Sequence, residues 1–327
     1  MNTKLCLKHP LTAICLCATL FMIMAMLACT QNRTKPLSPP KHPQTFVSIL
    51  GIAQDAGYPQ AGCLKDCCQA VYKDRSKARR AVCLGIVDQI GKTSWMIEAS
   101  PEFPSQYHDL QQLAPQNQFG GIWLTHAHIG HYSGLMHLGR EVMGAKRVPV
   151  YTMPRMKQFL DTNGPWSQLV KLQNIDLQRI KADTSYILNS QIAIEPILVP
   201  HRGEFSETVG YIVRGPAKSL LFIPDIDKWS HWERDIRDYI HQVDYALLDA
   251  TFFQNGEIPG RDMSEIPHPF VEESLVLFAD LPAKDKAKIH FLHFNHTNPL
   301  LQAGSAERQI VFDAGMNISE EGMVLAL

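Results

Sequence analysis

Short apolar runs separated by polar turns dominate the sequence from residue 46 onward, and they predict buried strands. Runs rich in Val, Ile, Leu and Phe are typical of strands covered on both faces. Such runs stand at 46–52, 82–88, 94–98, 122–125, 148–152, 192–199, 209–213, 220–224, 245–249 and 290–293. Helices are expected at 133–143, 154–161, 229–240 and 269–279. Strands interspersed with helices predict a layered α/β domain.

The first residues follow a different pattern, which is typical of an export signal. Lys4 and Lys8 precede an apolar run at 11–27 that contains no charge. The run ends in Leu27-Ala28-Cys29, and a cysteine at this position resembles the bacterial lipoprotein signal. The alternative is an uncleaved anchor, although the run is at the short end for a membrane-spanning helix.

We therefore expect three parts in the chain. Residues 1–28 form a lipoprotein signal peptide, and residues 29–44, which are polar and Pro-rich, form a flexible tether. Residues 45–327 form the folded domain. A lipid on Cys29 would attach the protein to a membrane. The residue after Cys29 is Thr30 and not an aspartate, which favours the periplasmic face of the outer membrane.

Composition narrows the classes of partner. The chain has 327 residues and a formal net charge of −1, so no overall basic field favours nucleic acid. A small-molecule substrate is expected instead, and the oligomeric state is left open. The 14 histidines are the unusual component, and their placement points to a metal.

Three histidines lie close together after the apolar run at 122–125. His126, His128 and His131 fall within six residues of chain, and buried imidazoles need partners of their own. Imidazole is a common ligand of zinc and similar metals. The alternative, a surface loop that happens to be rich in histidine, is much less favoured. The spacing therefore predicts a metal site.

Later strand ends carry further ligand types. His201, Asp225 and His293 each follow an apolar run, where a rigid strand stops and a polar loop begins. Each alone is typical of a turn residue, but together with the histidine triplet they form a ligand set. His268, between two prolines, is predicted to line the substrate cleft as a catalytic residue. Asp249 either orients a ligand histidine or simply ends a strand.

The order His-x-His-x-x-His, His, Asp, His resembles the metallo-β-lactamase superfamily. The resemblance implies a four-layer αββα sandwich with metals at one rim. It implies that His126, His128 and His201 hold one metal, that His131 and His293 hold a second, and that Asp225 bridges them and takes part in catalysis. A metal-bound hydroxide would then attack a carbonyl or phosphoryl centre.

One position departs from that superfamily. Its pattern is His-x-His-x-Asp-His, and Gly130 stands here in place of the aspartate. The second metal therefore loses a carboxylate ligand. The catalytic site is expected to hold one or two zinc ions, with iron or manganese as alternatives.

A second set of ligand types consists of cysteines. Cys63, Cys67 and Cys68 lie close together, and His296 follows His293 by three residues. This pattern resembles the phosphonate-catabolism cyclic phosphodiesterases, in which such residues hold a structural zinc. A disulfide that involves Cys83 is the alternative, because an oxidising compartment permits it.

Other motifs resemble the pyrroloquinoline-quinone biosynthesis protein B family. They are Gly57-Tyr58-Pro59-Gln60, the stretches 98–102 and 248–252, and 294–299. This chain differs from that family in its full histidine set and its export signal. Three hypotheses follow: a metal-dependent hydrolase of phosphodiester or ester-like bonds, an iron-dependent oxidative enzyme, or a non-catalytic metal-binding lipoprotein. Trp229 and Trp232 are expected to be core residues rather than a substrate platform.

Overall fold

The computed structural model describes residues 42–327. The predicted signal peptide, Cys29 and most of the tether lie outside the described residues. Within this part of the chain, no helix combines the length and apolar content that crossing a bilayer requires.

Seven strands form the first sheet, in the order β14-β1-β2-β3-β4-β5-β6. Most of them are the apolar runs that the sequence predicts, and β3 to β6 run parallel. Their bounds are β1 Thr45–Gly51, β2 Cys83–Asp88, β3 Thr93–Ile97, β4 Gln118–Trp123, β5 Val148–Thr152, β6 Ile175–Arg179 and β14 Val324–Ala326.

The second sheet also has seven strands, in the order β13-β12-β11-β10-β9-β8-β7. Here β10 to β13 run parallel, while β7, β8 and β9 pair antiparallel. The bounds are β7 Tyr186–Ile187, β8 Ala193–Leu198, β9 Val209–Arg214, β10 Ser219–Ile223, β11 Tyr245–Asp249, β12 Ile289–Leu292 and β13 Asn317–Ile318.

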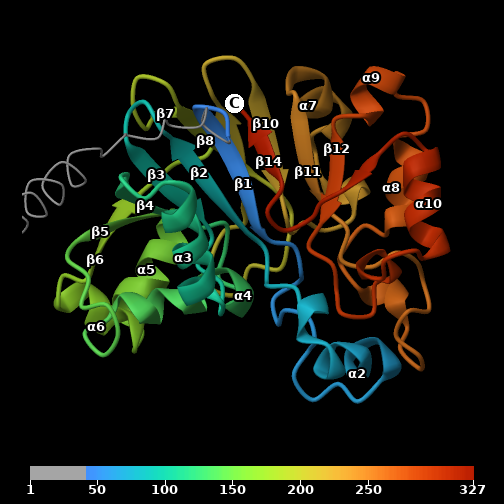
Figure 1. Cartoon of the computed structure of the whole chain (residues 1–327), viewed down its shortest axis with the longest axis horizontal. Helices are drawn as coiled ribbons and strands as arrows, with labels where there is room; N and C mark the ends of the chain where they lie inside the picture. Colours follow the sequence, from blue (N-terminus) through green and yellow to red (C-terminus); the bar gives the residue numbers. More distant parts are fainter. Residues whose placement is uncertain (1–41) are drawn as a thin grey trace, which may run out of the picture. The chain divides into compact units, whose positions relative to one another are not determined.

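Helices cover the outer face of each sheet (Figure 1). The helices are α2 Asp66–Lys73, α3 Phe103–Leu113, α4 Ile129–Tyr132, α5 Pro154–Thr162, α6 Trp166–Lys171, α7 Ile236–Gln242, α8 Val271–Leu277, α9 Ala283–Lys286 and α10 Ala306–Asp313. Short 3-10 helices are η1 Arg75–Lys77, η2 Ser133–Leu138, η3 Trp229–His231, η4 Met263–Glu265 and η5 Pro299–Leu301.

The alternation of side chains along the strands explains the layers. In β1, Val47 and Ile49 pack between the two sheets, whereas Phe46 and Leu50 face the layer of α3, α5 and α6. The other sheet buries residues of α7, α8 and α10 on its outer face. The predicted four-layer αββα sandwich is therefore confirmed.

Two predicted helices were wrong in their extent. The stretch 133–143 forms only η2, which follows α4 directly and ends at Leu138, after which Gly139 leads into turns. The stretch 229–240 divides into η3 and α7. The side chain of Asp235 accepts a hydrogen bond from the backbone N–H of Arg237, so a new helix begins there instead of continuing the earlier one.

Candidate metal centre

Four of the predicted ligands meet around a single point. The ligand atoms of His126, His128, His201 and Asp225 all lie within 4.8 Å of one another. Nε2 of His126 lies 3.1 Å from Oδ2 of Asp225, and Nε2 of His201 lies 3.1 Å from its Oδ1. Nδ1 of His128 lies 3.3 Å from Nε2 of His201. The three residues expected to hold the first metal are therefore close enough to contact one ion.

Two more groups of ligand atoms adjoin the first. Asp225, Asp249, His268 and His293 form one group, and Asp55, His131 and His293 form the other, each within 4.8 Å. His131 and His293 thus meet, as expected of ligands of a second metal. Asp55 was not foreseen from the sequence. We call these nine residues the histidine–carboxylate centre: His126, His128, His131, His201, His268, His293, Asp55, Asp225 and Asp249.

Strand ends and short turns position these side chains. The triplet histidines follow β4 and enter α4, while Asp225 follows β10 and His293 follows β12. His293 has a φ of 66°, in the left-handed region that non-glycine residues seldom adopt. Strained conformations of this kind cluster at functional sites.

Hydrogen bonds to Thr125 and Glu98 fix the tautomers of two imidazoles, those of His126 and His131. The Thr125 hydroxyl donates to Glu98, so it accepts from Nδ1 of His126 at 2.9 Å. Nδ1 of His131 lies 3.1 Å from Glu98, which can only accept. In the neutral form of both rings, Nε2 keeps its lone pair and faces the centre. Such second partners are typical of metal-binding histidines.

The Thr251 hydroxyl does the same for His293. It donates to Asp249 at 2.7 Å and lies 2.9 Å from Nδ1 of His293. Asp249 therefore orients one histidine through Thr251 and contacts another directly, since its Oδ2 lies 2.8 Å from Nδ1 of His268. The hydrogen-bonding role considered for Asp249 matches this arrangement.

Negative charge exceeds positive charge in the centre. Among the described residues, no Lys or Arg forms an ion pair with Asp55, Glu98, Asp225 or Asp249. Burial raises the pKa of Asp225, but the surrounding imidazoles lower it well below its usual value. Burial lowers the pKa of His131, but Glu98 and Asp55 raise it well above its usual value. The lowered pKa of Asp225 and the raised pKa of His131 both indicate a site that attracts cations.

The residues present fit a metal. Nε2 of His126, His131 and His293 is buried in each case without a hydrogen-bond partner, and so are Oδ1 of Asp55 and Asp225. Unpartnered buried polar atoms are costly unless an ion or water satisfies them. Two ligands of one zinc ion, each at about 2.0–2.2 Å, lie roughly 3.0–3.6 Å apart. The separations of 3.1–3.3 Å fall in this range.

His268 lies deeper than expected. It was predicted to line the substrate cleft, but it is 7% exposed and sits among the ligand atoms. Burial lowers its pKa, yet Asp249 and Asp225 raise that pKa to about 9. His268 therefore carries a proton at neutral pH unless a metal displaces it.

The second predicted ligand set also comes together. The ligand atoms of Cys63, Cys67, Cys68 and His296 lie within 4.8 Å of one another, and we call them the cysteine cluster. Burial raises the pKa of Cys68 to about 12, with the neighbouring thiols acting in the same direction, so Cys68 is a neutral thiol at neutral pH unless it binds a cation.

The alternative disulfide with Cys83 does not form. All four described cysteines are free, and Cys83 is buried in the layer between the first sheet and its helices. This position on β2 belongs to a different hydrophobic cluster from Cys68.

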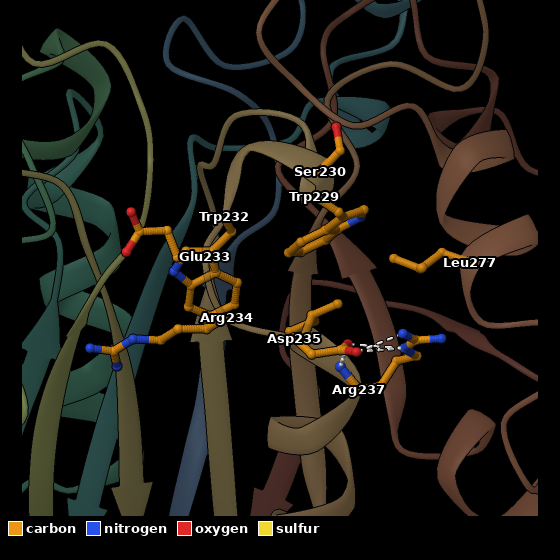
Figure 2. Close-up of a pocket in the computed structure, with 9 residues that line it drawn as sticks. Trp229, Ser230, Trp232, Glu233, Arg234, Asp235, Arg237 and Leu277 are labelled. Atoms are coloured by element: carbon orange, nitrogen blue, oxygen red, sulfur yellow. Dashed lines mark hydrogen bonds and ion pairs between the residues drawn. The ribbon is translucent and has the colours of Figure 1, made fainter.

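A cleft of about 620 Å³ is lined by residues of both sets, namely Asp55 of the centre and Cys63 and His296 of the cysteine cluster. Lys65 and Arg261 also line it and contribute positive charge. A smaller hollow of about 330 Å³ lies between η3 and α7 (Figure 2). Its arginines are paired, Arg237 with Asp235 and Arg234 with Asp183, and it contains none of the clustered ligand atoms. The larger cleft is therefore the candidate substrate site.

Residues 94–291 match the β-lactamase superfamily domain. The chain belongs to the metallo-β-lactamase superfamily. Curated relatives carry the name coenzyme PQQ synthesis protein B. The one from Klebsiella pneumoniae is 26% identical over 86% of this chain and 98% of its own. The one from Xanthomonas campestris pv. campestris is 24% identical over 86% and 99%.

Solved structures show the same superfamily fold. Zinc-bound PqqB from Methylobacterium extorquens aligns with a TM-score of 0.73 at 22% identity, over 86% of this chain and 100% of that one. A diphosphatase from the PhnP family aligns with a TM-score of 0.59 at 19% identity, over 86% and 98%. Human tRNase Z, short form, aligns with a TM-score of 0.53 at 13% identity, over 86% and 98%. The resemblance to the superfamily and to PqqB-like proteins is confirmed.

Proposed function

We propose that this protein is a metal-dependent hydrolase that acts on a phosphodiester or ester-like bond in a small anionic substrate. The position of Asp225 carries the proposal. Its carboxylate lies within reach of both ligand groups, with His126 and His201 on one side and His268 and His293 on the other. A carboxylate shared in this way suits two neighbouring metal ions, zinc above all, with iron or manganese as alternatives.

Each protein group has a defined task in this proposal. Metal ions held here would supply Lewis acidity and a nucleophilic water at neutral pH. Thr125, Glu98 and Thr251 hold the imidazole tautomers, so that the lone pairs of His126, His131 and His293 face inward. His268, which keeps a proton on Nδ1 between Asp225 and Asp249, adds positive charge beside the reacting group.

The cleft supports an anionic substrate. Lys65 and Arg261 line it, and both side chains are exposed to solvent. A phosphodiester carries a negative charge that these cations would attract. The PhnP-family diphosphatase shares this fold, which agrees with a phosphoester substrate.

The test is turnover by the purified protein loaded with zinc or manganese. Bis(p-nitrophenyl) phosphate and p-nitrophenyl esters serve as probes. We expect metal-dependent release of p-nitrophenol, abolished by a chelator and by Asp225→Asn. The exposed Asp161, which pairs only with Lys157 at 3.8 Å, offers the control Asp161→Asn. No turnover of either probe with any of these metals would argue against a hydrolase.

A second candidate rests on the names of the relatives. Proteins named coenzyme PQQ synthesis protein B match nearly their whole length, so an iron-dependent oxidative role is the alternative. It predicts oxygen consumption by the iron-loaded protein and no p-nitrophenol release. Measurement of both quantities on one preparation separates the two functions.

Two further proposals concern the rest of the chain. The cysteine cluster would hold a structural zinc, because four ligands of this type leave no open position. The N-terminal pattern supports a lipid on Cys29, export, and attachment to the periplasmic face of the outer membrane. Labelled fatty acid should be incorporated by the wild-type protein and not by Cys29→Ser.

A further inference from the structure

Asp55 occupies the space that a side chain at position 130 would need. Gly130 stands where the superfamily pattern has an aspartate. A Cβ atom added to Gly130 would lie 2.3 Å from Cα of Asp55 and 2.5 Å from its Oδ1. Real Cβ atoms do not approach other atoms so closely. A side chain at 130 and the present position of Asp55 therefore exclude each other.

The backbone holds Asp55 in this place. The segment after β1 pairs with the segment after β12: the N–H of Gln54 donates to Phe294 at 2.8 Å, and the N–H of Phe294 donates to Ile52 at 2.9 Å. Asp55 then enters a turn that closes where the N–H of Gly57 donates to Gln54 at 2.8 Å. These bonds set Asp55 directly beside His293, which precedes Phe294.

The carboxylate of Asp55 faces two imidazole lone pairs. Its Oδ1 lies 3.1 Å from Nε2 of His131, and both atoms are buried without a hydrogen-bond partner. Because Glu98 accepts the hydrogen on Nδ1 of His131, the Nε2 atom that faces Asp55 is free either to carry a second proton or to bind a metal ion. Nε2 of His293 belongs to the same group and is also unpartnered. A proton can join Asp55 to His131 in the metal-free protein, but it leaves Nε2 of His293 without a partner, whereas one metal ion would engage all three residues.

We propose that Asp55 is the carboxylate ligand of the second metal, in place of the aspartate missing at position 130. The ligand reaches the site from a different chain segment, and the absence of a side chain at Gly130 leaves the space that Asp55 occupies. His131, His293, Asp225 and Asp55 then supply the second site. This proposal rests on the proposed function, because it assigns a ligand within the same centre.

The test measures the number of zinc ions bound per chain of full-length protein after dialysis against buffered zinc. Wild type is compared with Asp55→Asn, with Gly130→Ala and with the control Asp161→Asn. We expect Asp55→Asn to hold one zinc fewer than wild type and the control to equal it. Gly130→Ala changes no ligand, but its Cβ would displace Asp55, so it should lose the same zinc. A titration with a competing chelator should show that only one class of site is weakened, by at least about 10-fold.

The outcomes separate this proposal from the proposed function. A full zinc complement of unchanged affinity in Asp55→Asn would overturn the role of Asp55 and leave the hydrolase intact. A wild-type protein that holds zinc only on the cysteine cluster would overturn both. The melting temperature of the metal-free variants shows whether each has folded. If Asp55→Asn fails to fold, Gly130→Ala decides: retention of its zinc overturns the proposal.

Discussion

The histidine–carboxylate centre and the cysteine cluster are both ligand sets, but they are built in different ways. The centre draws its side chains from the ends of strands in both sheets, and six of the nine are buried. The cluster draws three ligands from one short stretch, 63–68, and only His296 from elsewhere. It packs in a small hydrophobic group apart from the main core.

This difference separates two uses of a metal. Ligands on rigid strand ends can be held to the tolerance that catalysis needs, and a mixed imidazole and carboxylate set leaves positions open for water. Three thiols and one imidazole close a tetrahedron and stabilise a loop that has little core of its own. We therefore expect the centre to control activity and the cluster to control stability.

The largest expected effect is on the centre. His126→Ala removes a buried ligand from the first group, so activity should fall by more than about 100-fold and a metal should be lost. The melting temperature of the metal-free protein and the zinc on the cysteine cluster should stay unchanged. Hydrolysis assays measure the activity, elemental analysis measures the metal content, and thermal unfolding measures the melting temperature. His108→Ala, on the exposed face of α3, is the control. Loss of the cysteine-bound zinc would break the separation between the two sets.

Removal of a ligand from the cysteine cluster should lower stability and leave the centre intact. His296→Ala should remove one zinc and lower the melting temperature by roughly 5–10 °C, which corresponds to about 3 kcal/mol for a domain of this size. Thermal unfolding with and without zinc measures the effect. The metals of the centre should remain. If metal content and melting temperature both match wild type, the cluster is not a structural zinc site.

A smaller effect is expected one step outside the centre. Glu98→Gln keeps the size of the side chain but weakens its hold on Nδ1 of His131, so metal affinity should fall about 10–100-fold. Glu102→Gln is the matched control, because Glu102 accepts hydrogen bonds from Ser100 and the backbone of Ala81 but contacts no histidine. Equal affinities in the two variants would mean that Glu98 does not orient the ligand.

The smallest effect concerns Glu257, which precedes Ile258, a residue that lines the larger cleft. Burial raises the pKa of Glu257 to about 7. Because the pKa of Glu257 is higher in the folded protein than its ordinary value of about 4.5, the folded state is most stable when the carboxyl is protonated. This stabilisation is complete below about pH 4.5 and is lost as the pH rises through 7. Glu257→Gln should therefore be more stable than wild type at pH 8, by about 1–2 kcal/mol, with the gap closing toward pH 5. Chemical denaturation at both pH values measures this, and a gap of equal size at both would contradict the assignment.

Much of the fold could be predicted because its strands are continuous apolar runs. β5 and β11 match their predicted bounds, and the others differ by a few residues at their ends. β6, with the alternating sequence Ile-Asp-Leu-Gln-Arg, was missed, and so were the short strands β7, β13 and β14. The alternation in β6 is a strand signal, but it covers only five residues, and β7, β13 and β14 are too short for any pattern and form because neighbouring strands provide hydrogen-bond partners.

The site could be predicted only where its ligands carry a local signal. His126, His128 and His131 form a motif, and His201, Asp225 and His293 each end an apolar run. Asp55 lies in a turn rich in small residues, and nothing in its neighbours marks it as special. Its position depends on the pairing of segments about 240 residues apart, so only the three-dimensional fold reveals it.

The backbone pairing of Ile52 and Gln54 with Phe294 also sets the order of events during biogenesis. A ribosome delivers Asp55 and the three neighbouring cysteines early and His293 and His296 near the end, so the ligand group of Asp55, His131 and His293 and the cysteine cluster are completed only late in synthesis. Acidic groups and thiols made first must wait, protonated or solvated, for their last partners. Chains interrupted before residue 293 should accordingly contain the ligands of the first group but lack the last ligand of the second group and of the cysteine cluster.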